Sequence, residues 1–440
     1  MKRLRRILTA LSLLALPLSC SAPGSDGAGG KRASLELPPA SAAVSYAVSG
    51  AAGPDDLARH AIRHHPSLEA ARHRAARLSQ KAPQDRALPD PMIEMAAGSM
   101  AETAAGRVDA VGVVKQQIPF PGKRSAAAAA SESEAAAARA EIKALELKLT
   151  EQVHAAWWDL YLAEQTISIS RESRSVLEAL REVIDARVAT DQAAQADQLR
   201  LANEVSLVDR DLANADQLHN TARARLNSLL NRPSGSALPS AAGARIPSAG
   251  SLDGLLAQAQ SKHPEVAAAE QRANAFRHRL KRAELEKYPD FTAGIAGAAV
   301  SDSGLSRVAN GRDQVYATLG VSIPLWQEPR RAMIREAQEG IAETESMLAA
   351  TRSELRYRVE EAWYRAKTSR DVASLFETRL IPDAKQAYDV TLSGYSSGKS
   401  SYTDLMETWR GLLGYRLQLA SNRAQIGKAT ATLRAAAGIR

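Results

Sequence analysis

The stretch VVKQQIPFPGKRSAAAAASESEAAAARAEIK, residues 113–143, contains two kinds of pattern joined by a proline-rich corner. Its first residues alternate roughly between apolar and polar, which is typical of a strand. After Pro119, Pro121 and Gly122, it becomes a run of Ala, Glu, Lys and Arg that favours a helix. The same succession returns in LGVSIPLWQEPRRAMIREAQEGIAETE, residues 319–345. The chain therefore joins a strand to a long helix twice, each time through prolines.

Matching landmarks run through both halves of the chain in the same order. His65-Pro66 corresponds to His263-Pro264, and VHAAWWDL from residue 153 corresponds to VEEAWYRA from residue 359. The offset between matches drifts only from 198 to 207 residues, so few insertions separate the copies. The same order of landmarks at one spacing predicts a tandem duplication. The expected divisions are a first repeat at 54–231, a linker at 232–250 and a second repeat at 251–438.

Each repeat is expected to read helix, strand, strand, long helix, helix. In the second repeat, every other residue from Val315 to Ile323 is apolar, which predicts a strand with one apolar face. Phe291–Ala299 is its expected hairpin partner. The first repeat offers strands at Met92–Met100 and Val108–Ile118.

Single apolar stripes with spacings of three and four residues mark the long helices. No proline interrupts the pattern from about 124 to 188. About 65 residues would make a rod on the order of 100 Å long. Such a rod needs a partner helix to cover its stripe. Segments 194–231 and 401–437 supply returning helices, so coiled helical hairpins are expected in a mainly α chain with a small β part.

Four short amphipathic strands per chain are too few to close a barrel, because about eight is the minimum. Their exposed edges must nevertheless be paired. Three copies of the chain would supply twelve strands. Several chains could therefore pool their strands into one barrel, whose strands would turn at the proline corners into long coiled helical hairpins.

The N-terminus has the pattern of an export signal. A basic stretch and about 13 mostly apolar residues precede Cys20, which predicts a signal peptide at 1–19. Cys20 lies where a lipoprotein carries its lipid, so lipidation at Cys20 is expected, with ordinary cleavage near Ala22 as the alternative. Residues 20–53 are rich in Gly, Ser, Ala and Pro and are expected to form an extended lead-in. No later stretch has 18 uninterrupted apolar residues, so no membrane-spanning helix is predicted.

Composition argues against two classes of function. The formal net charge is +8, but Lys and Arg alternate with Glu and Asp along helical patterns, which indicates solvated helix surface and not a nucleic-acid partner. No phosphate-binding glycine loop is present, and the one cysteine lies at the processed end. We therefore expect neither an enzyme nor a cofactor.

The duplicated layout, the corners QQIPFPGKR and SIPLWQEPRR, and GYSSGKSSYTDLMETW from residue 394 resemble the TolC outer-membrane factor family. The resemblance covers nearly all of the mature chain. ALPDPMIEM and PFPGK further resemble the members that work with heavy-metal efflux pumps.

The resemblance implies a homotrimer in the outer membrane of a Gram-negative bacterium, with a trimeric 12-stranded β-barrel in contact with outer-membrane lipid and a helical tunnel in the periplasm. The trimer would be the exit duct of a tripartite efflux system, with a periplasmic adaptor protein and an inner-membrane pump of the resistance-nodulation-division (RND) type. Heavy-metal cations are the expected cargo. Drug efflux and type I protein secretion are the alternative functions, because ducts for both share the fold. A non-transport coiled coil of the envelope would not explain the alternating strands.

By position, the resemblance also implies a gate at the periplasmic helix tips. Asp404 and Glu407 match the acidic pair of the second repeat, Asp197 matches the acid of the first, and Tyr395 matches the tip tyrosine. In a trimer each acid would form a ring of three with a strong negative potential. The alternative is ordinary solvated helix surface. The residues expected to contact the adaptor are Gly398, Lys399, Ser400, Ser401 and Tyr402. Ser400 stands where a drug-exporting relative has a basic residue, so the closed state here is expected to use other contacts.

Three further groups of residues are interpreted as structural. The histidines His60, His64, His65 and His73 lack a carboxylate or thiolate shell, so surface or packing roles are expected and no metal site is predicted. The methionines Met92, Met95 and Met100 fall in a predicted strand, where packing or lipid contact is expected. The tryptophans Trp157, Trp158 and Trp363 fall within long helices and are expected to anchor packing.

Overall fold

A computed structural model describes residues 53–98, 102–103, 106–191, 193–245, 250–302 and 311–439. The predicted signal peptide, Cys20, nearly all of the lead-in and Met100 lie outside these residues. The chain divides into two compact units, and each unit draws on both repeats. Among the described residues, the first unit draws on the segments 83–128 and 278–337, and the second on 53–82, 129–277 and 338–439.

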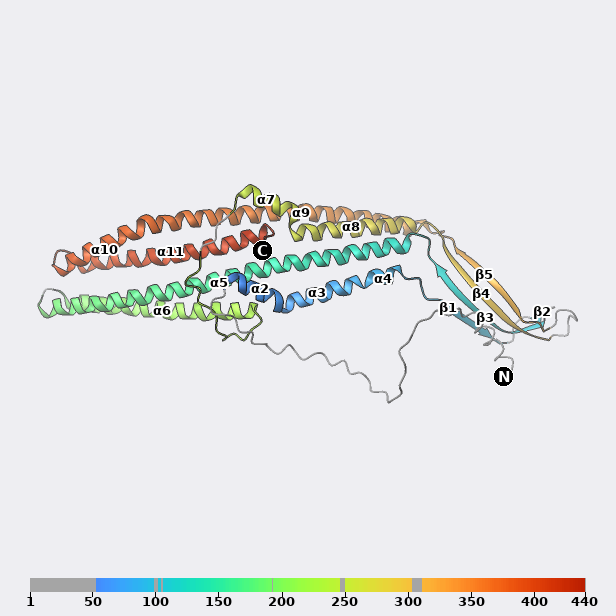
Figure 1. Cartoon of the computed structure of the whole chain (residues 1–440), viewed down its shortest axis with the longest axis horizontal. Coiled ribbons are helices and arrows are strands. Elements are labelled where there is room, and N and C mark those ends of the chain that lie inside the picture. The colour runs from blue at the N-terminus through green and yellow to red at the C-terminus, as the bar shows by residue number, and fades with distance from the viewer. Residues whose placement is uncertain are drawn as a thin grey trace, which may run out of the picture. The chain divides into compact units, whose positions relative to one another are not determined.

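The first unit contains an antiparallel sheet with the order β1-β3-β4-β5, in which β2 pairs with β3 (Figure 1). The strands are β1 (Met92–Ala97), β2 (Glu102–Thr103), β3 (Gly106–Ile118), β4 (Asp290–Ser301) and β5 (Gln314–Ser322). The hairpin expected in the second repeat is confirmed, since Phe291 on β4 pairs with Val321 on β5. The two repeats meet where Ile118 on β3 pairs with Phe291. The first predicted strand ends earlier than expected, at Ala97.

Both edges of this sheet are open in the described part of the chain. β1 and β5 each pair with a single neighbour there. All six residues of β1 are exposed. Large apolar side chains lie bare on the edge strands, including Met95 at 81% exposure and Leu319 at 88%. An open edge with exposed apolar side chains requires a partner.

The strand-to-helix corner of the first repeat is held by a buried lysine. Lys123 begins α5, and its Nζ lies 2.9 Å from Oδ1 of Asp290 and 3.1 Å from Oε2 of Glu286. The backbone N–H of Phe120 donates to the same Asp290 oxygen at 2.7 Å. The Phe120 ring stacks on the Tyr288 ring, with the centroids 4.5 Å apart. Gly122 turns the chain with φ of +98°, a conformation that favours glycine. The proline corners therefore join strands to helices, as the sequence predicts.

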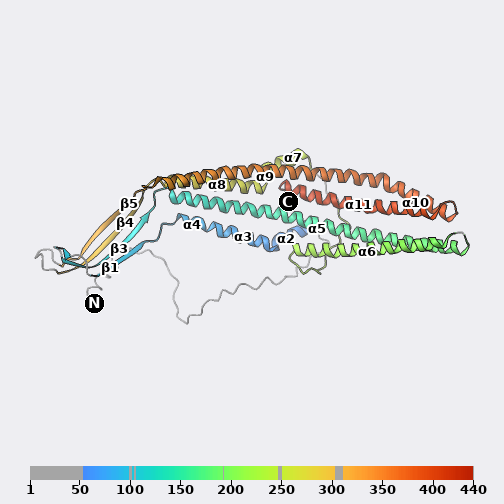
Figure 2. The same ribbon diagram turned by 180° about the vertical axis from the view of Figure 1, so that it is seen from behind.

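The helices are long and pair as hairpins. Figures 1 and 2 both show α6 lying along α5 and α11 lying along α10. The helices are α2 (Pro54–His64), α3 (Pro66–Ser79), α4 (Lys81–Arg86), α5 (Lys123–Ala189), α6 (Gln195–Leu229), α7 (Leu252–Lys262), α8 (Pro264–Leu285), α9 (Gln327–Leu375), α10 (Ile381–Ser396) and α11 (Tyr402–Ala436). The expectation of a mainly helical chain with long coiled hairpins is confirmed. None of the helices in the described part of the chain combines the length and the apolar character that crossing a membrane requires.

The tryptophans of α5 are packing residues, as predicted. Trp157 and Trp158 are both 3% exposed within a core cluster. Trp158 packs so closely on α11 that a Cβ placed on Gly427 would lie 1.9 Å from its ring. Trp363 instead donates from Nε1 to the carbonyl of Gly250 at 3.1 Å.

The second long helix is not continuous, and this differs from the uninterrupted apolar stripe in the sequence. A π-helical turn, Phe376–Leu380, separates α9 from α10. Pro382 follows at the second position of α10, and it lacks the backbone N–H that a continuous α-helix running from α9 into α10 would need there. A local change of hydrogen-bond register accommodates such a missing donor. The α5 helix of the first repeat runs through 67 residues without a break.

Candidate functional site

The two helical hairpins of the second unit end in tight turns that depend on unusual backbone conformations. The first turn follows α5, where Asp191 has φ of +57°. The second follows α10, where Gly398 has φ of +77°. There the carbonyl of Gly394 accepts from the N–H of Lys399 at 2.7 Å, and a Cβ on Gly394 would lie 2.2 Å from Oγ of Ser400. Both glycines are thus required for this turn.

Ser401 and Asp404 close the start of α11 with a reciprocal capping box. The N–H of Asp404 donates to Oγ of Ser401, and the N–H of Ser401 donates to Oδ2 of Asp404, both at 3.1 Å. Hydrogen bonding from the side chain and the backbone of Ser401 lowers the pKa of the Asp404 carboxyl group. Asp404 therefore has a local capping role that was not predicted from the sequence, although a Ser three residues before an Asp is the usual signal for one. Glu407 is exposed one turn further along the same helix.

The structure brings Asp197, Tyr395 and Tyr402 together, whereas the carboxylate of Asp404 is bonded to Ser401. Tyr395 and Tyr402 are 3% and 7% exposed. Burial raises the pKa of both phenols, and the nearby Asp197 carboxylate adds to the effect on each. Asp197 itself lies 3.2 Å from Nη1 of Arg200.

The phenol oxygens of both tyrosines are buried, and neither has a hydrogen-bond partner in the described part of the chain. An unsatisfied buried hydroxyl costs on the order of 1–3 kcal/mol. The Arg187 guanidinium of α5 lies 4.6 Å from the centroid of the Tyr395 ring and contributes a cation–π contact. The tyrosines therefore lie in a cluster that combines favourable packing with unsatisfied polar groups.

We refer to this region as the tip cluster. Its buried members come from the hairpins of both repeats: Leu177, Leu180, Ile184, Leu201, Val208, Tyr395, Tyr402, Leu405, Met406 and Trp409. The apolar contacts fix the two hairpins against each other near their turns.

An ion pair between the repeats completes the tip cluster. Glu204 on α6 is 8% exposed and accepts from two nitrogens of Arg410 on α11, with Nε at 3.3 Å from Oε2. Glu204 also contributes, after burial, to raising the pKa of Tyr402 to about 12. This ion pair was not predicted from the sequence. The sequence feature that could have indicated it is the position of Glu204 within the apolar stripe of α6, between Leu201 and Val208.

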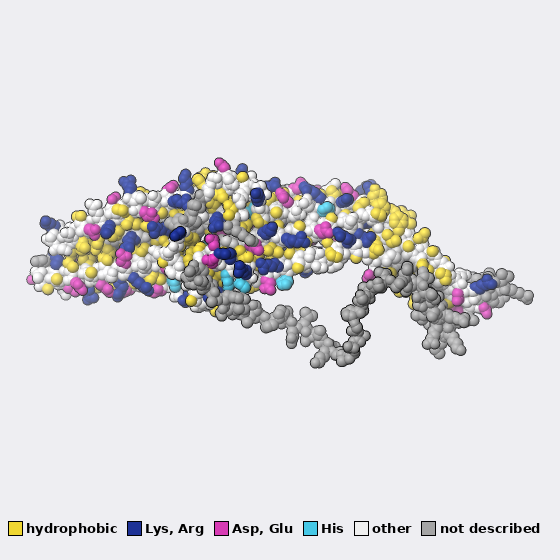
Figure 3. Space-filling view, in the orientation of Figure 1, with side chains coloured by type: hydrophobic (Ala, Val, Ile, Leu, Met, Phe, Trp, Pro, Cys, Tyr) yellow, Lys and Arg dark blue, Asp and Glu magenta, His cyan; other side chains and the backbone are white. Residues whose placement is uncertain are grey.

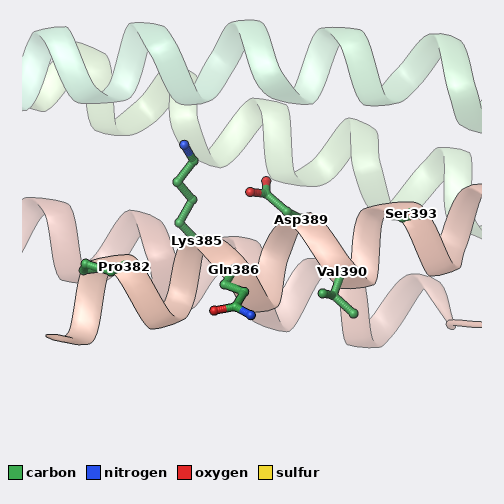
Figure 4. Close-up of a pocket in the computed structure, with 6 residues that line it drawn as sticks. All are labelled: Pro382, Lys385, Gln386, Asp389, Val390 and Ser393. Atoms are coloured by element: carbon green, nitrogen blue, oxygen red, sulfur yellow. The ribbon is translucent and has the colours of Figure 1, made fainter.

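A groove of about 590 Å³ follows α10 between the π-helical turn and the tip. Its lining residues are Pro382, Lys385, Gln386, Asp389, Val390 and Ser393. Figure 4 shows Lys385 and Asp389 directed to one side of α10 and Gln386 and Val390 to the other. Val390 is 64% exposed, so the groove presents both charge and apolar surface.

The histidines that the sequence singled out, His60, His64, His65 and His73, contact other side chains or the backbone. The rings of His60 and His64 lie 4.7 Å apart, and Nδ1 of His65 accepts from the N–H of Ser67 at 3.2 Å. His73 lies 3.9 Å from Glu69. Among the residues that the structure describes, no group of three or more His, Cys, Asp or Glu side chains is placed to hold a metal ion.

Comparison with known proteins gives a family match over part of the chain and a match of fold over 88% of it. Residues 255–439 match the family model described as outer membrane efflux protein. No curated protein matches the sequence.

Several solved structures share the fold at low sequence identity. The outer membrane protein VceC from Vibrio cholerae is 19% identical, with 88% of this chain and 96% of VceC aligned and a TM-score of 0.72. CusC is 16% identical, with 88% and 92% aligned and a TM-score of 0.72. The open state of the MtrE outer membrane channel from Neisseria gonorrhoeae is 16% identical, with 88% and 89% aligned and a TM-score of 0.71. This likeness shows that the chain shares the fold of these outer membrane proteins.

Proposed function

We infer that this chain is an outer membrane efflux protein, the passive exit duct of a tripartite efflux system. The observation that carries the inference is the pairing of an open-edged apolar sheet with long helical hairpins in one chain. The family match over residues 255–439 supports the same function.

The duct is a homotrimer that spans the outer membrane of a Gram-negative bacterium through its strands. Counting β1, β3, β4 and β5, three chains supply twelve strands, which exceeds the roughly eight needed for closure. Joining the edge β5 of one chain to the edge β1 of the next would remove both open edges. The exposed apolar side chains of the sheet would then face lipid, and the helical hairpins would extend into the periplasm.

Light scattering on the purified protein tests this assembly. We expect three copies per particle in detergent and aggregation once detergent is removed. A folded monomer that stays in solution without detergent would contradict the assembly.

The tip cluster is the gate of the duct. With the two hairpins packed together at the tip cluster, the Glu204–Arg410 ion pair and the Arg187–Tyr395 contact hold them in place. Moving the second hairpin away would break both contacts but would hydrate the two unsatisfied tyrosine hydroxyls. The two effects oppose each other, so a modest bias from a partner is enough to shift the gate.

Rings of acids line the pore beside this gate. Three copies each of Asp197, Asp404 and Glu407 would concentrate cations in a narrow passage. Asp404 and Glu407 are exposed on α11, which is compatible with this role. Asp197 would contribute less, because Arg200 lies 3.2 Å from it.

The partner that biases the gate is a periplasmic adaptor protein joined to an inner-membrane RND pump. The turn from Gly398 to Tyr402 is the contact site for the adaptor, and the groove along α10 ends at Ser393, shortly before this turn. The groove offers the mixture of charge and apolar surface that a helical partner would need.

Heavy-metal cations are the proposed cargo, on the basis of the ALPDPMIEM and PFPGK stretches. Deleting the gene should lower tolerance to one or more heavy metals and leave tolerance to organic drugs unchanged. Loss of drug tolerance alone would indicate a drug-efflux duct, and loss of a secreted protein would indicate type I secretion.

Cys20 is proposed to carry the lipid of the mature protein. Mass spectrometry of the mature N-terminus should find a chain that begins at Cys20 with lipid attached. A chain that begins near Ala22 without lipid would contradict this.

A further inference from the structure

We propose that the strand-to-helix corner of the first unit binds the headgroup of an anionic phospholipid. The corner combines the cations Arg124, Lys287, Arg330 and Arg331 with exposed Tyr288 and Trp326. The inference rests on the proposed function, because it requires the strands to enter the outer membrane and the corner to lie at the membrane surface.

Three cations at this corner, Arg124, Arg330 and Arg331, have no carboxylate partner among the described residues. Arg124 donates from Nη1 to the carbonyl of Arg86 at 2.8 Å, and Arg330 donates from Nε to the carbonyl of Glu286 at 2.9 Å. Both acceptors are neutral. Across the described residues, no carboxylate lies within ion-pair distance of Arg124, Arg330 or Arg331. These guanidinium groups are therefore available to pair with an external anion.

Both repeats place two cations near the start of a long helix: Lys123-Arg124 are the first two residues of α5, and Arg330-Arg331 are the fourth and fifth residues of α9. Glu328 in the first turn of α9 pairs with Arg335. The helix dipole disfavours cations at this end and favours anions. The carboxylates of Glu286 and Asp290 neutralise Lys123. The other three cations keep their charge at a place where the helix ends themselves attract phosphate.

The neighbouring apolar surface selects a lipid over a free phosphate ion. Leu325 and Trp326 are 72% and 78% exposed, and Tyr288 is 39% exposed. Figure 3 shows hydrophobic side chains gathered where β5 joins α9. This surface continues onto the strand through exposed Val321 and Ile323. Trp and Tyr beside Lys and Arg are the combination enriched at membrane–water interfaces.

Native mass spectrometry of the full-length protein in detergent tests the proposal by counting bound lipids. We expect phosphatidylglycerol to bind more tightly than phosphatidylethanolamine. The double variant Lys287→Gln with Arg331→Gln should weaken phosphatidylglycerol binding by about tenfold or more, at roughly 1 kcal/mol per cation. Both side chains are exposed, and Lys287 Nζ lies 5.1 Å from the Tyr288 ring centroid, a weak contact at the surface. The fold should therefore survive.

The control is Arg356→Gln with Lys367→Gln on α9. Arg356 is likewise exposed, and Lys367 Nζ lies 5.4 Å from the Trp363 ring centroid. Each double variant therefore removes two positive charges, one of which lies beside an aromatic ring. The control variant should bind phosphatidylglycerol like the wild type.

Equal weakening in both variants, no weakening in either, or displacement of the lipid by an equal concentration of inorganic phosphate would overturn the proposal. A trimer that conducts ions but binds both lipids equally would overturn it and leave the proposed function intact.

Discussion

Asp404 has two candidate roles that a single substitution can separate. Its carboxylate caps α11 through Ser401, and its charge is proposed to attract cations in the pore. Asparagine keeps an oxygen for the cap but removes the charge. We expect Asp404→Asn to weaken block by divalent cations in conductance recordings and to leave thermal stability nearly unchanged.

Asp404→Ala is the companion variant and should lose both roles. Asp404→Ala loses the hydrogen bond from the Ser401 N–H to the carboxylate, whereas Oγ of Ser401 can still accept from the backbone N–H of residue 404. The free energy of unfolding should fall by about 0.5–1.5 kcal/mol. If Asp404→Asn leaves divalent block unchanged, the residue is a cap and not part of the gate.

The buried histidines predict how stability depends on pH. Burial lowers the pKa of His154 and His263 below that of a free histidine. The folded state thus binds fewer protons than the unfolded state between the folded pKa and about 6.5. The stabilising contribution is complete above about pH 6.5 and is lost as pH falls toward the folded pKa. The melting temperature should therefore drop between pH 7 and pH 5.

His263 offers a test of this cause. Its Nδ1 accepts from the N–H of Glu265 at 3.2 Å, and its Nε2 lies 3.1 Å from the carbonyl of Ala435. Protonation would remove the acceptor at Nδ1. Asparagine caps helices without titrating, so His263→Asn should reduce the acid-induced drop in melting temperature. An unchanged drop would mean that other groups dominate.

The packing of α5 on α11 depends on the absence of one side chain. A Cβ on Gly427 would meet buried Trp158 at 1.9 Å, and overpacking of this kind costs about 1–3 kcal/mol. Gly427→Ala should therefore lower the free energy of unfolding, as measured by denaturant titration. The control is Gly414→Ala on the same helix, where a Cβ would meet nothing within 4 Å. Alanine there should be neutral or stabilising, and equal effects at both positions would contradict this packing account.

The strands and long helices follow from periodicity in the sequence, because apolar residues recur at every second position in β5 and at every third or fourth position in the long helices. The π-helical turn at Phe376–Leu380 does not, since the apolar stripe continues through it. Pro382 was the available sign of a break. Glu204 was visible as a polar residue in an apolar stripe, but its partner Arg410 is 206 positions away in the other repeat. Periodicity within one segment carries no information about such a partner.

At the scale of the whole molecule, the sequence duplication does not produce two separate folding units. β3 of the first repeat pairs with β4 of the second, and the tip cluster also joins both repeats. Each compact unit therefore requires both copies. This arrangement leaves β1 and β5 as the open edges of the sheet, and the proposed trimer pairs them between chains.

Single-channel conductance in planar lipid bilayers tests the central claim, that the chain forms a duct held closed at the tip cluster. The wild-type protein should form channels of low conductance. Neutralising the ion pair with Glu204→Gln and Arg410→Gln should raise conductance severalfold. The control is Arg277→Gln with Glu345→Gln, an exposed pair at 2.9 Å between α8 and α9 that should leave conductance unchanged. Failure of the wild type to form channels, or equal conductance in all three proteins, would contradict the account.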